Sequence, residues 1–224
     1  MDSLLTATTY VKTAKAEKPK PKKKQVQKQK PTIEFSGRAL VSLLRHIIFS
    51  EMLSSGYVPC KSLKECFKNV VTDEMLLDCV IREASGDKGA KQRLSMCTID
   101  SILHIRANQG HSEKVAARLV PSLIYERIET SLSEVFHGTT RPNLRRILSS
   151  GLNKMARGAI HCATSPDARS GARKSSDVRI YINMQEAMAD GIEFFMSENG
   201  VVLTTGVNGI LDPKYFGDIV LLTL

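Results

Sequence analysis

The stretch RLSMCTIDSILHI, residues 93–105, decides the fold expected for the first half of the chain. Branched and other apolar residues dominate two short runs within it, 93–97 and 101–105. Runs of this length and composition are typical of β-strands. Because so few residues separate the runs, we predict that the two strands pair as a small β-hairpin.

Three helices are predicted upstream of the hairpin, because apolar residues recur there at helical spacing. The predicted helices cover about 40–48, 63–70 and 75–81. Ser36 is the expected N-cap of the first helix, and the glycines of 86–89 are expected to end the third. Helices followed by a β-hairpin favour a winged-helix-like arrangement, which is common in nucleic-acid contact, although a fold alone does not decide a function.

The second half of the chain alternates short strands with helices, so we predict an α+β fold. Residues 119–125, which contain Pro121, are the expected linker between the halves. The expected extended segments are 135–136, 160–163, 178–182, 201–204 and 219–222, and the expected helices are 144–148 and 184–191. We therefore predict three parts: a tail at 1–31, a first lobe at 32–122 and a second lobe at 123–224.

The tail at 1–31 carries most of the net charge of +9, because it has nine lysines against Asp2 and Glu17. Such a segment cannot bury enough surface to offset the entropy of ordering, so we expect it to be disordered. Its KPKPKKK run fits a nuclear-import signal, a nonspecific phosphate-binding arm or a solubilising tail. The rest of the chain is only slightly basic, so recognition of a polyanion must come from clustered arginines.

The composition excludes several classes of protein. Apolar residues make up 42% and charged residues 25%, as in soluble globular proteins. None of the five cysteines forms a C-x-x-C pair, so neither a zinc site nor a disulfide framework is expected, and buried free thiols fit a reducing compartment. No apolar run approaches the roughly 20 residues of a membrane-spanning helix, and no secretory signal opens the chain. We expect a soluble intracellular protein, nuclear or cytoplasmic or both.

Arginine, histidine and threonine side chains are the candidates for chemistry, because the common nucleotide, zinc-protease and serine-hydrolase motifs are missing. Arg45 and His46 could grip a phosphate dianion or form an exposed pair on a helix. The polar segment 106–112 could contact sugar-phosphate, order a domain junction or form a surface turn. The HGT tripeptide at 137–139 could open a ligand site or make a simple turn.

Eight segments resemble the RNA 2′-phosphotransferase family in their order and spacing. They are SGRALVSLLRH (36–46), GYVP (56–59), AKQRL (90–94), IRANQGHS (105–112), FHGTT (136–140), SGLNKMARGAIHCAT (150–164), SGARKSSDVRIYIN (170–183) and DGIEFFMSENGVVLT (190–204). Each fragment alone is modest, but together they cover about residues 36–222. The resemblance implies a winged-helix lobe followed by a lobe of the ADP-ribosyltransferase type.

The resemblance also implies a reaction, with NAD⁺ as co-substrate and no metal. The family removes an internal 2′-phosphate from RNA, typically one left at a tRNA splice junction. The phosphate would attack C1″ of the nicotinamide riboside and expel nicotinamide, and the 2″-hydroxyl would then attack phosphorus, releasing ADP-ribose 1″,2″-cyclic phosphate. A monomer acting on ligated tRNA is expected. The alternatives are an ADP-ribosyltransferase that caps terminal phosphates of nucleic acids and a nonenzymatic RNA-binding protein.

The family's functional residues map onto this chain residue by residue. Those that handle the phosphate correspond to Arg45, His46, Arg93 and Arg157, and those expected to contact NAD⁺ are His137, Gly138, Thr139, His161, Arg173 and Ser175, with Ser176 nearby. Val201 or a neighbour falls where other ADP-ribosyltransferases place glutamate. The chain departs from the family at Gly158-Ala159, where Asn-His is usual, and at Leu94, where Phe is usual.

Overall fold

A computed structural model gives the fold of the chain and describes residues 35–67, 70–86, 91–168, 170–173 and 175–223. One compact unit spans Thr32–Leu224. The lysine-rich segment at 1–31 lies outside the described residues, so the disorder and the roles expected of it remain predictions.

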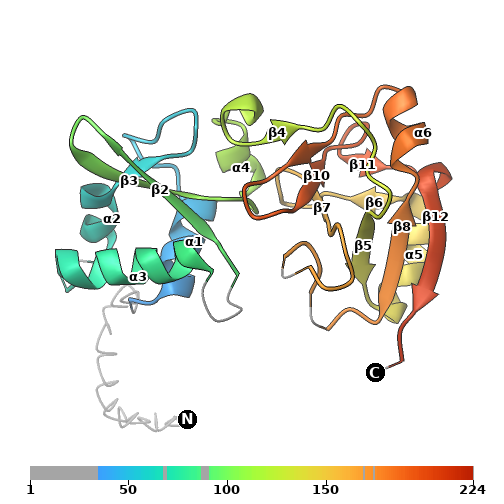
Figure 1. Cartoon of the computed structure of the whole chain (residues 1–224), viewed down its shortest axis with the longest axis horizontal. Helices are drawn as coiled ribbons and strands as arrows, with labels where there is room; N and C mark the ends of the chain where they lie inside the picture. The colour runs from blue at the N-terminus through green and yellow to red at the C-terminus, as the bar shows by residue number, and fades with distance from the viewer. Residues whose placement is uncertain (1–34, 68–69, 87–90, 169, 174, 224) are drawn as a thin grey trace, which may run out of the picture. The chain divides into compact units, whose positions relative to one another are not determined.

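The first half contains the helices and the hairpin that its sequence predicts (Figure 1). Its elements are α1 (Gly37–His46), β1 (Val58–Pro59), α2 (Cys60–Cys66), α3 (Asp73–Ser85), β2 (Leu94–Ile99) and β3 (Ile102–Ala107). β2 and β3 pair antiparallel along their whole length, and β1 pairs with the other edge of β3. Asp100 and Ser101 turn the hairpin, at φ 49° and 62°. The hairpin prediction is confirmed.

The first helix begins where predicted and ends earlier. Ser36 caps it, because the Ser36 side chain accepts a hydrogen bond from the backbone N–H of Ala39 at 3.2 Å. α1 ends at His46 because Ile47 takes an extended conformation, with φ −107° and ψ 135°. Ile47 and Ile48 are 41% and 39% exposed, so the predicted extension of the helix to residue 48 is wrong.

A separate hydrophobic core holds the first half together. The apolar faces of its helices pack against its sheet through buried side chains that include Leu40, Leu44, Val58, Leu63, Leu76, Val80, Leu94 and Ile105. Each such side chain contributes about 1.5–3 kcal/mol by leaving water. This packing fixes the C-terminal end of α1, and with it the backbone position of Arg45.

The second half consists of small antiparallel sheets and short helices around its own core. Its elements are α4 (Glu113–Ala116), β4 (Glu126–Arg127), β5 (Phe136–Thr139), α5 (Arg141–Ser150), β6 (Leu152–Asn153), β7 (Ile160–Cys162), β8 (Val178–Ile182), α6 (Met184–Ala189), β9 (Phe195–Met196), β10 (Val202–Thr204), β11 (Ile210–Leu211) and β12 (Phe216–Leu221), with 3₁₀ turns at Pro121–Leu123 and Pro213–Tyr215. The sheet orders are β4-β9-β10-β7, β12-β8-β5 and β11-β6. Two backbone hydrogen bonds between Phe136 and Ala163, of 3.0 and 2.9 Å, bring β5 beside β7.

Helices and antiparallel strands in one chain confirm the α+β class. The HGT tripeptide, however, lies inside a strand rather than after it. Gly138 and Thr139 pair with Arg179 and Val178 of β8, so the strand runs to residue 139. The prediction that this strand ends at Phe136 is therefore wrong, and the tripeptide is not a turn.

Gly151, at the end of α5, provides a test of the backbone that shapes this half. Its φ of 80° and ψ of 174° belong almost exclusively to glycine, and a Cβ there would lie 2.5 Å from the Leu211 carbonyl oxygen. Gly200, at φ 74°, has open space around it. We expect Gly151→Ala to lower the free energy of unfolding by about 1–3 kcal/mol more than Gly200→Ala does, as measured by urea denaturation. Equal losses would contradict this account of the turn.

Candidate active site

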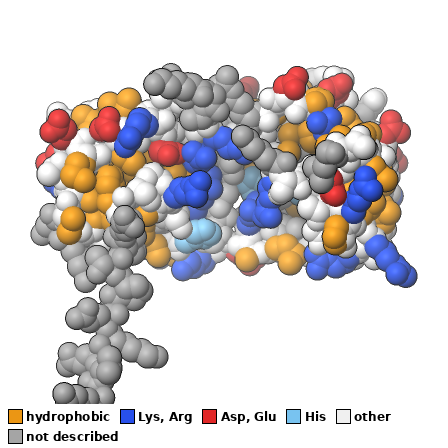
Figure 2. All heavy atoms as spheres, turned by 90° about the horizontal axis from the view of Figure 1, so that it is seen from below, with side chains coloured by type: hydrophobic (Ala, Val, Ile, Leu, Met, Phe, Trp, Pro, Cys, Tyr) orange, Lys and Arg blue, Asp and Glu red, His pale blue; other side chains and the backbone are white. Residues whose placement is uncertain are grey.

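A cleft of about 500 Å³ lies between β5, α5 and the approach to β7. Its walls include every residue predicted to contact NAD⁺: His137, Gly138, Thr139, His161, Arg173 and Ser175. Arg157 also lines it. Figure 2 shows Lys, Arg and His side chains gathered around a hollow in the middle of one face of the molecule. The structure thus places residues from four separate segments of the second half around one cavity.

His137 is held as a neutral imidazole with a defined tautomer. Its Nδ1 lies 2.9 Å from the His161 carbonyl oxygen, which can only accept, so Nδ1 carries the proton and Nε2 remains an acceptor. Burial lowers the pKa of His137, and the positive charge of Arg157 lowers it further, while the bond to the carbonyl partly offsets both effects. The ring therefore offers the cleft an unprotonated nitrogen at neutral pH.

His161 is the most deeply buried histidine that lines the cleft. Its side chain is 8% exposed, and its Nε2 has no hydrogen-bond partner among the residues that the structure describes. Burial, followed by the charges of Arg157 and Arg45, lowers the pKa of His161 to about 3. A buried polar atom without a partner costs about 1–3 kcal/mol. Such an atom on a cavity wall is a candidate contact for a ligand that supplies a hydrogen-bond donor.

Gly138 is required by packing within the protein. A Cβ at this position would lie 2.9 Å from Ala172 Cβ and 3.0 Å from Ser176 Oγ. The loop that carries Arg173 and Ser175 therefore rests directly on the backbone of β5. A side chain at position 138 would displace this loop, which forms part of the cleft wall.

Three arginines from distant segments lie close enough to disturb one another electrostatically. Burial lowers the pKa of Arg45 to about 10, and the next contributions come from Arg157 and then Arg93. The Nε of Arg45 is buried without a partner among the described residues. Burial, followed by the charge of Arg173, also lowers the pKa of Arg157. Like charges in one partly buried place indicate a site for an anion.

Backbone pairing explains why Arg45 and Arg157 meet. The N–H of Ser112 donates to the Arg45 carbonyl oxygen at 2.8 Å, and Ser112 also forms an antiparallel bridge with Arg157. On either side of that bridge, Glu113 N–H donates to Ala156 O at 3.0 Å and Gly158 N–H donates to His111 O at 2.9 Å. One short strand segment therefore holds the end of α1 beside the approach to β7.

The other two phosphate candidates, Arg93 and His46, lie outside the lining of the cleft. Arg93 precedes β2 and forms an ion pair with Glu83, at 2.8 Å from Nη1 to Oε2. His46, the last residue of α1, is exposed, and its charge reaches His111. Among the described residues, Arg45, His46 and Arg93 stand outside the lining of the cleft, while Arg157 belongs to both groups.

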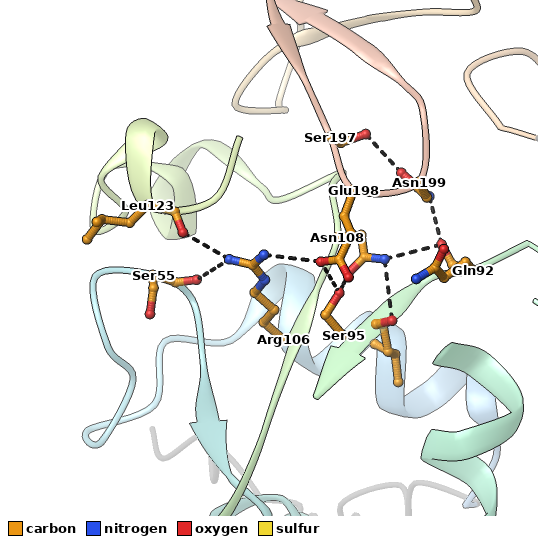
Figure 3. A network of polar contacts seen from close by, with 10 residues as sticks. Ser55, Gln92, Ser95, Arg106, Asn108, Leu123, Ser197, Glu198 and Asn199 are labelled. Atoms are coloured by element: carbon orange, nitrogen blue, oxygen red, sulfur yellow. Dashed lines mark hydrogen bonds and ion pairs between the residues drawn. The ribbon is translucent and has the colours of Figure 1, made fainter. Parts of the chain in front are cut away.

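The segment 106–112 orders a junction between distant parts of the chain (Figure 3). Arg106 lies 4.7 Å from the centre of the Tyr57 ring, donates to Leu123 O at 3.0 Å and pairs with Glu198 at 3.2 Å. Its side chain is 11% exposed, so the surface-turn interpretation of this segment is wrong. These contacts join segments that are far apart in the sequence, and the roles as a domain junction or a sugar-phosphate contact stay predictions.

Glu198 and Asn199 reach the same network from the turn between β9 and β10 (Figure 3). Glu198 accepts a hydrogen bond from Ser95 Oγ, and Asn199 Nδ2 donates to the Gln92 carbonyl oxygen at 2.8 Å. Because Gln92 directly precedes Arg93, the turn restrains the backbone next to a candidate phosphate ligand. These polar side chains follow no local periodicity, and the sequence analysis missed them.

Sequence reasoning also missed polar residues on the cleft wall and beside it. Asn143 and Arg146 on α5, together with Lys154, line the cleft. Beyond His161 a second, more apolar hollow of about 370 Å³ is lined by His111 and Tyr125, among others. Their side chains are 3.1 Å apart, from Nδ1 to the hydroxyl. In the sequence, the only indication of these polar cleft residues was the polar face of the helix predicted at 144–148.

The described part of the chain holds no group of three or more His, Cys, Asp or Glu side chains arranged to bind a metal ion. It also has no helix long and apolar enough to cross a membrane.

The thiols are free: Cys79 and Cys162 are buried and the other three are half-buried. Burial raises the pKa of Cys162 to about 12, so this thiol is not a nucleophile.

Neutral histidines on a cleft wall, beside a group of partly buried arginines, are typical of an enzyme that handles a phosphate group. The profile of the RNA 2′-phosphotransferase, Tpt1 / KptA family matches residues 30–206. The chain belongs to this family.

Individual relatives agree with the family assignment. The chain is 39% identical over 175 residues to tRNA 2′-phosphotransferase 1 of Danio rerio, a match that covers 74% of each chain. It is 34% identical over 194 residues to tRNA 2′-phosphotransferase 1 of Homo sapiens, covering 80% of this chain and 72% of the human one. A Schizosaccharomyces pombe protein that also carries the tRNA 2′-phosphotransferase name is 40% identical over 189 residues, but these are 80% of this chain and 49% of that relative.

The buried histidines predict how stability depends on pH. Burial lowers the pKa of His161 to about 3 and that of His111 to about 4, from an ordinary value of 6.5. Between about pH 4 and pH 6.5 the unfolded chain binds more protons than the folded chain, so stability is lost as the pH falls through this window. Each buried histidine contributes a slope of about 1.4 kcal/mol per pH unit. We expect His161→Gln to flatten the measured slope by this amount.

Urea denaturation at a series of pH values from 4.5 to about 7 measures this slope. Wild-type protein, measured over the same pH series, is the reference for the slope. A slope that is the same in wild type and in His161→Gln would show that the folded protein tolerates a protonated His161.

Proposed function

We propose that this chain removes an internal 2′-phosphate from RNA, of the kind left at a tRNA splice junction, with NAD⁺ as co-substrate. The observation that carries the proposal is the meeting of Arg45, Arg93 and Arg157 beside the cleft of His137 and His161. Partly buried guanidinium groups that repel one another are stabilised by an anion between them. A phosphate dianion supplies the matching charge and accepts bidentate hydrogen bonds from arginine.

The parts of the chain would divide the work. Residues 32–122 would form a winged-helix-like lobe that presents Arg45, His46 and Arg93 to RNA. Residues 123–224 would form an ADP-ribosyltransferase-like lobe that binds NAD⁺. The lysines of 1–31 would add nonspecific contacts to RNA phosphates or direct nuclear import. One copy of the chain carries all of these groups, so we propose that a monomer acts in the nucleus or cytoplasm.

In the first step, an oxygen of the RNA 2′-phosphate forms a bond to C1″ of the nicotinamide riboside. The C1″–N bond breaks, and its electron pair leaves with neutral nicotinamide. The attacking phosphate is already an anion, so no general base is required. Arg45 and Arg157 would hold it in line for attack. The unprotonated Nε2 atoms of His137 and His161 would accept hydrogen bonds from hydroxyl or amide groups of the dinucleotide.

In the second step, the ADP-ribose 2″-hydroxyl oxygen attacks phosphorus and the bond to the RNA 2′-oxygen breaks. The hydroxyl proton ends on that 2′-oxygen, so the products are RNA with a 2′-hydroxyl and ADP-ribose 1″,2″-cyclic phosphate. The arginines would stabilise the negative charge that builds up on the phosphoryl oxygens. His46 would carry the proton, because an imidazole can both accept and donate one.

Removing either of the two central arginines tests the proposal. We expect Arg45→Ala and Arg157→Ala each to lower kcat/KM by about 100-fold or more, because each removes a donor that stabilises charge in the transition state. The assay is release of nicotinamide and of dephosphorylated RNA from a 2′-phosphorylated oligonucleotide. Arg82→Ala is the control, because the Arg82 side chain is 70% exposed on α3 and forms an ion pair with Asp78 of the same helix.

The products distinguish the alternatives. Normal turnover by either variant would contradict the assigned roles. Nicotinamide release without ADP-ribose cyclic phosphate would point to capping of a terminal phosphate of a nucleic acid. Wild-type protein that releases no nicotinamide in the presence of 2′-phosphorylated RNA would be an RNA-binding protein.

A further inference from the structure

Glu83 lies beside the arginine group and takes no part in the mechanism above. It stands in the last turn of α3, and its side chain is 19% exposed. Its Oε2 accepts a hydrogen bond from Arg93 Nη1 at 2.8 Å. Its backbone oxygen accepts a second bond, from the Arg93 N–H at 2.7 Å. Arg93 is thus attached to one residue of α3 through both its backbone and its guanidinium group.

Gly37 restricts the position of this carboxylate. A Cβ at Gly37 would lie 2.9 Å from Glu83 Cδ and closer still to Oε1. The carboxylate therefore rests against bare backbone in the first turn of α1, and any other residue at position 37 would displace it. The same helix ends at Arg45 and His46, so α1 holds the carboxylate at one end and a candidate phosphate ligand at the other.

Glu83 also acts on the charge of the arginine group. Its negative charge raises the pKa of Arg45, against the lowering by burial, Arg157 and Arg93. Without Glu83, three cations would repel one another with one carboxylate fewer to offset them. The loss would act on Arg93 most directly, because its guanidinium would be free to swing toward solvent and away from Arg45.

We propose that Glu83 is a positioning residue that fixes Arg93 in the orientation needed to bind the RNA 2′-phosphate. The proposal rests on the proposed function, because it takes Arg93 as a phosphate ligand. Glu83 would not touch the substrate. It would act only through Arg93, by holding one edge of the guanidinium group and leaving its other N–H groups for the phosphate.

A double-mutant cycle tests whether Glu83 acts through Arg93. We expect Glu83→Ala to lower kcat/KM for 2′-phosphorylated RNA by about 10- to 100-fold and to leave the KM for NAD⁺ unchanged, because Glu83 lies outside the cleft lining. In an Arg93→Ala background, Glu83→Ala should have no further effect. Glu83→Gln keeps an oxygen acceptor for Arg93 and should recover part of the activity. Asp78→Ala, which removes an exposed ion pair on the same helix, is the control and should match wild type.

Each result of the cycle supports or contradicts the positioning of Arg93 by Glu83. If Glu83→Ala matches wild type, or lowers activity by the same factor with and without Arg93, Glu83 does not position Arg93. If the alanine variant fails to fold, the Glu83→Gln cycle gives the same answer, because an additive loss would again overturn the proposal. If Arg93→Ala itself turns over normally, the phosphate role of Arg93 in the proposed function fails, and the role of Glu83 fails with it.

Discussion

The site depends on a short antiparallel pairing between segments 111–113 and 156–158. Three backbone hydrogen bonds, from Ser112 N–H to Arg45 O and from the N–H groups of Glu113 and Gly158 to the facing strand, tie the end of α1 to the approach to β7. Backbone bonds of this kind are indifferent to side-chain charge, so they can hold two arginines together that would otherwise separate. Without these bonds, repulsion between the Arg45 and Arg157 guanidinium groups would favour their separation.

Arginines held together in this way repel one another, and an anion bound between them would offset that repulsion. The fold offsets part of the repulsion with the carboxylate of Glu83 and keeps His137 and His161 neutral by burial. Neutral imidazoles add no further positive charge and present lone pairs instead. In the proposed function the two kinds of side chain would have different tasks: the arginines would bind a phosphate, and the neutral histidines would contact the partner that the phosphate attacks.

Local patterns predicted local structure well. Two short apolar runs predicted the β2–β3 hairpin, Ser36 was the expected cap of α1, and the extended segment expected at 178–182 is β8. The end of α1 was missed because Ile47 and Ile48 continue the apolar pattern while the backbone turns away. The residues predicted around NAD⁺ do share a cleft. The HGT pattern at 137–139 left a ligand site and a turn as alternatives, and the resemblance to a family pointed to the other residues. The roles of Glu83 and Glu198 could not be predicted from the sequence. Glu83 contacts Arg93, 10 positions away, and Glu198 contacts Arg106, 92 positions away.

The central claim is that the arginine group recognises a phosphate on the RNA 2′-oxygen. Fluorescence anisotropy with two short RNAs of identical sequence, one with and one without an internal 2′-phosphate, measures this most directly. Charge-assisted hydrogen bonds contribute about 1.5–3 kcal/mol each, so the 2′-phosphorylated RNA should bind about 100-fold more tightly or better. Equal dissociation constants for the two RNAs would contradict the account.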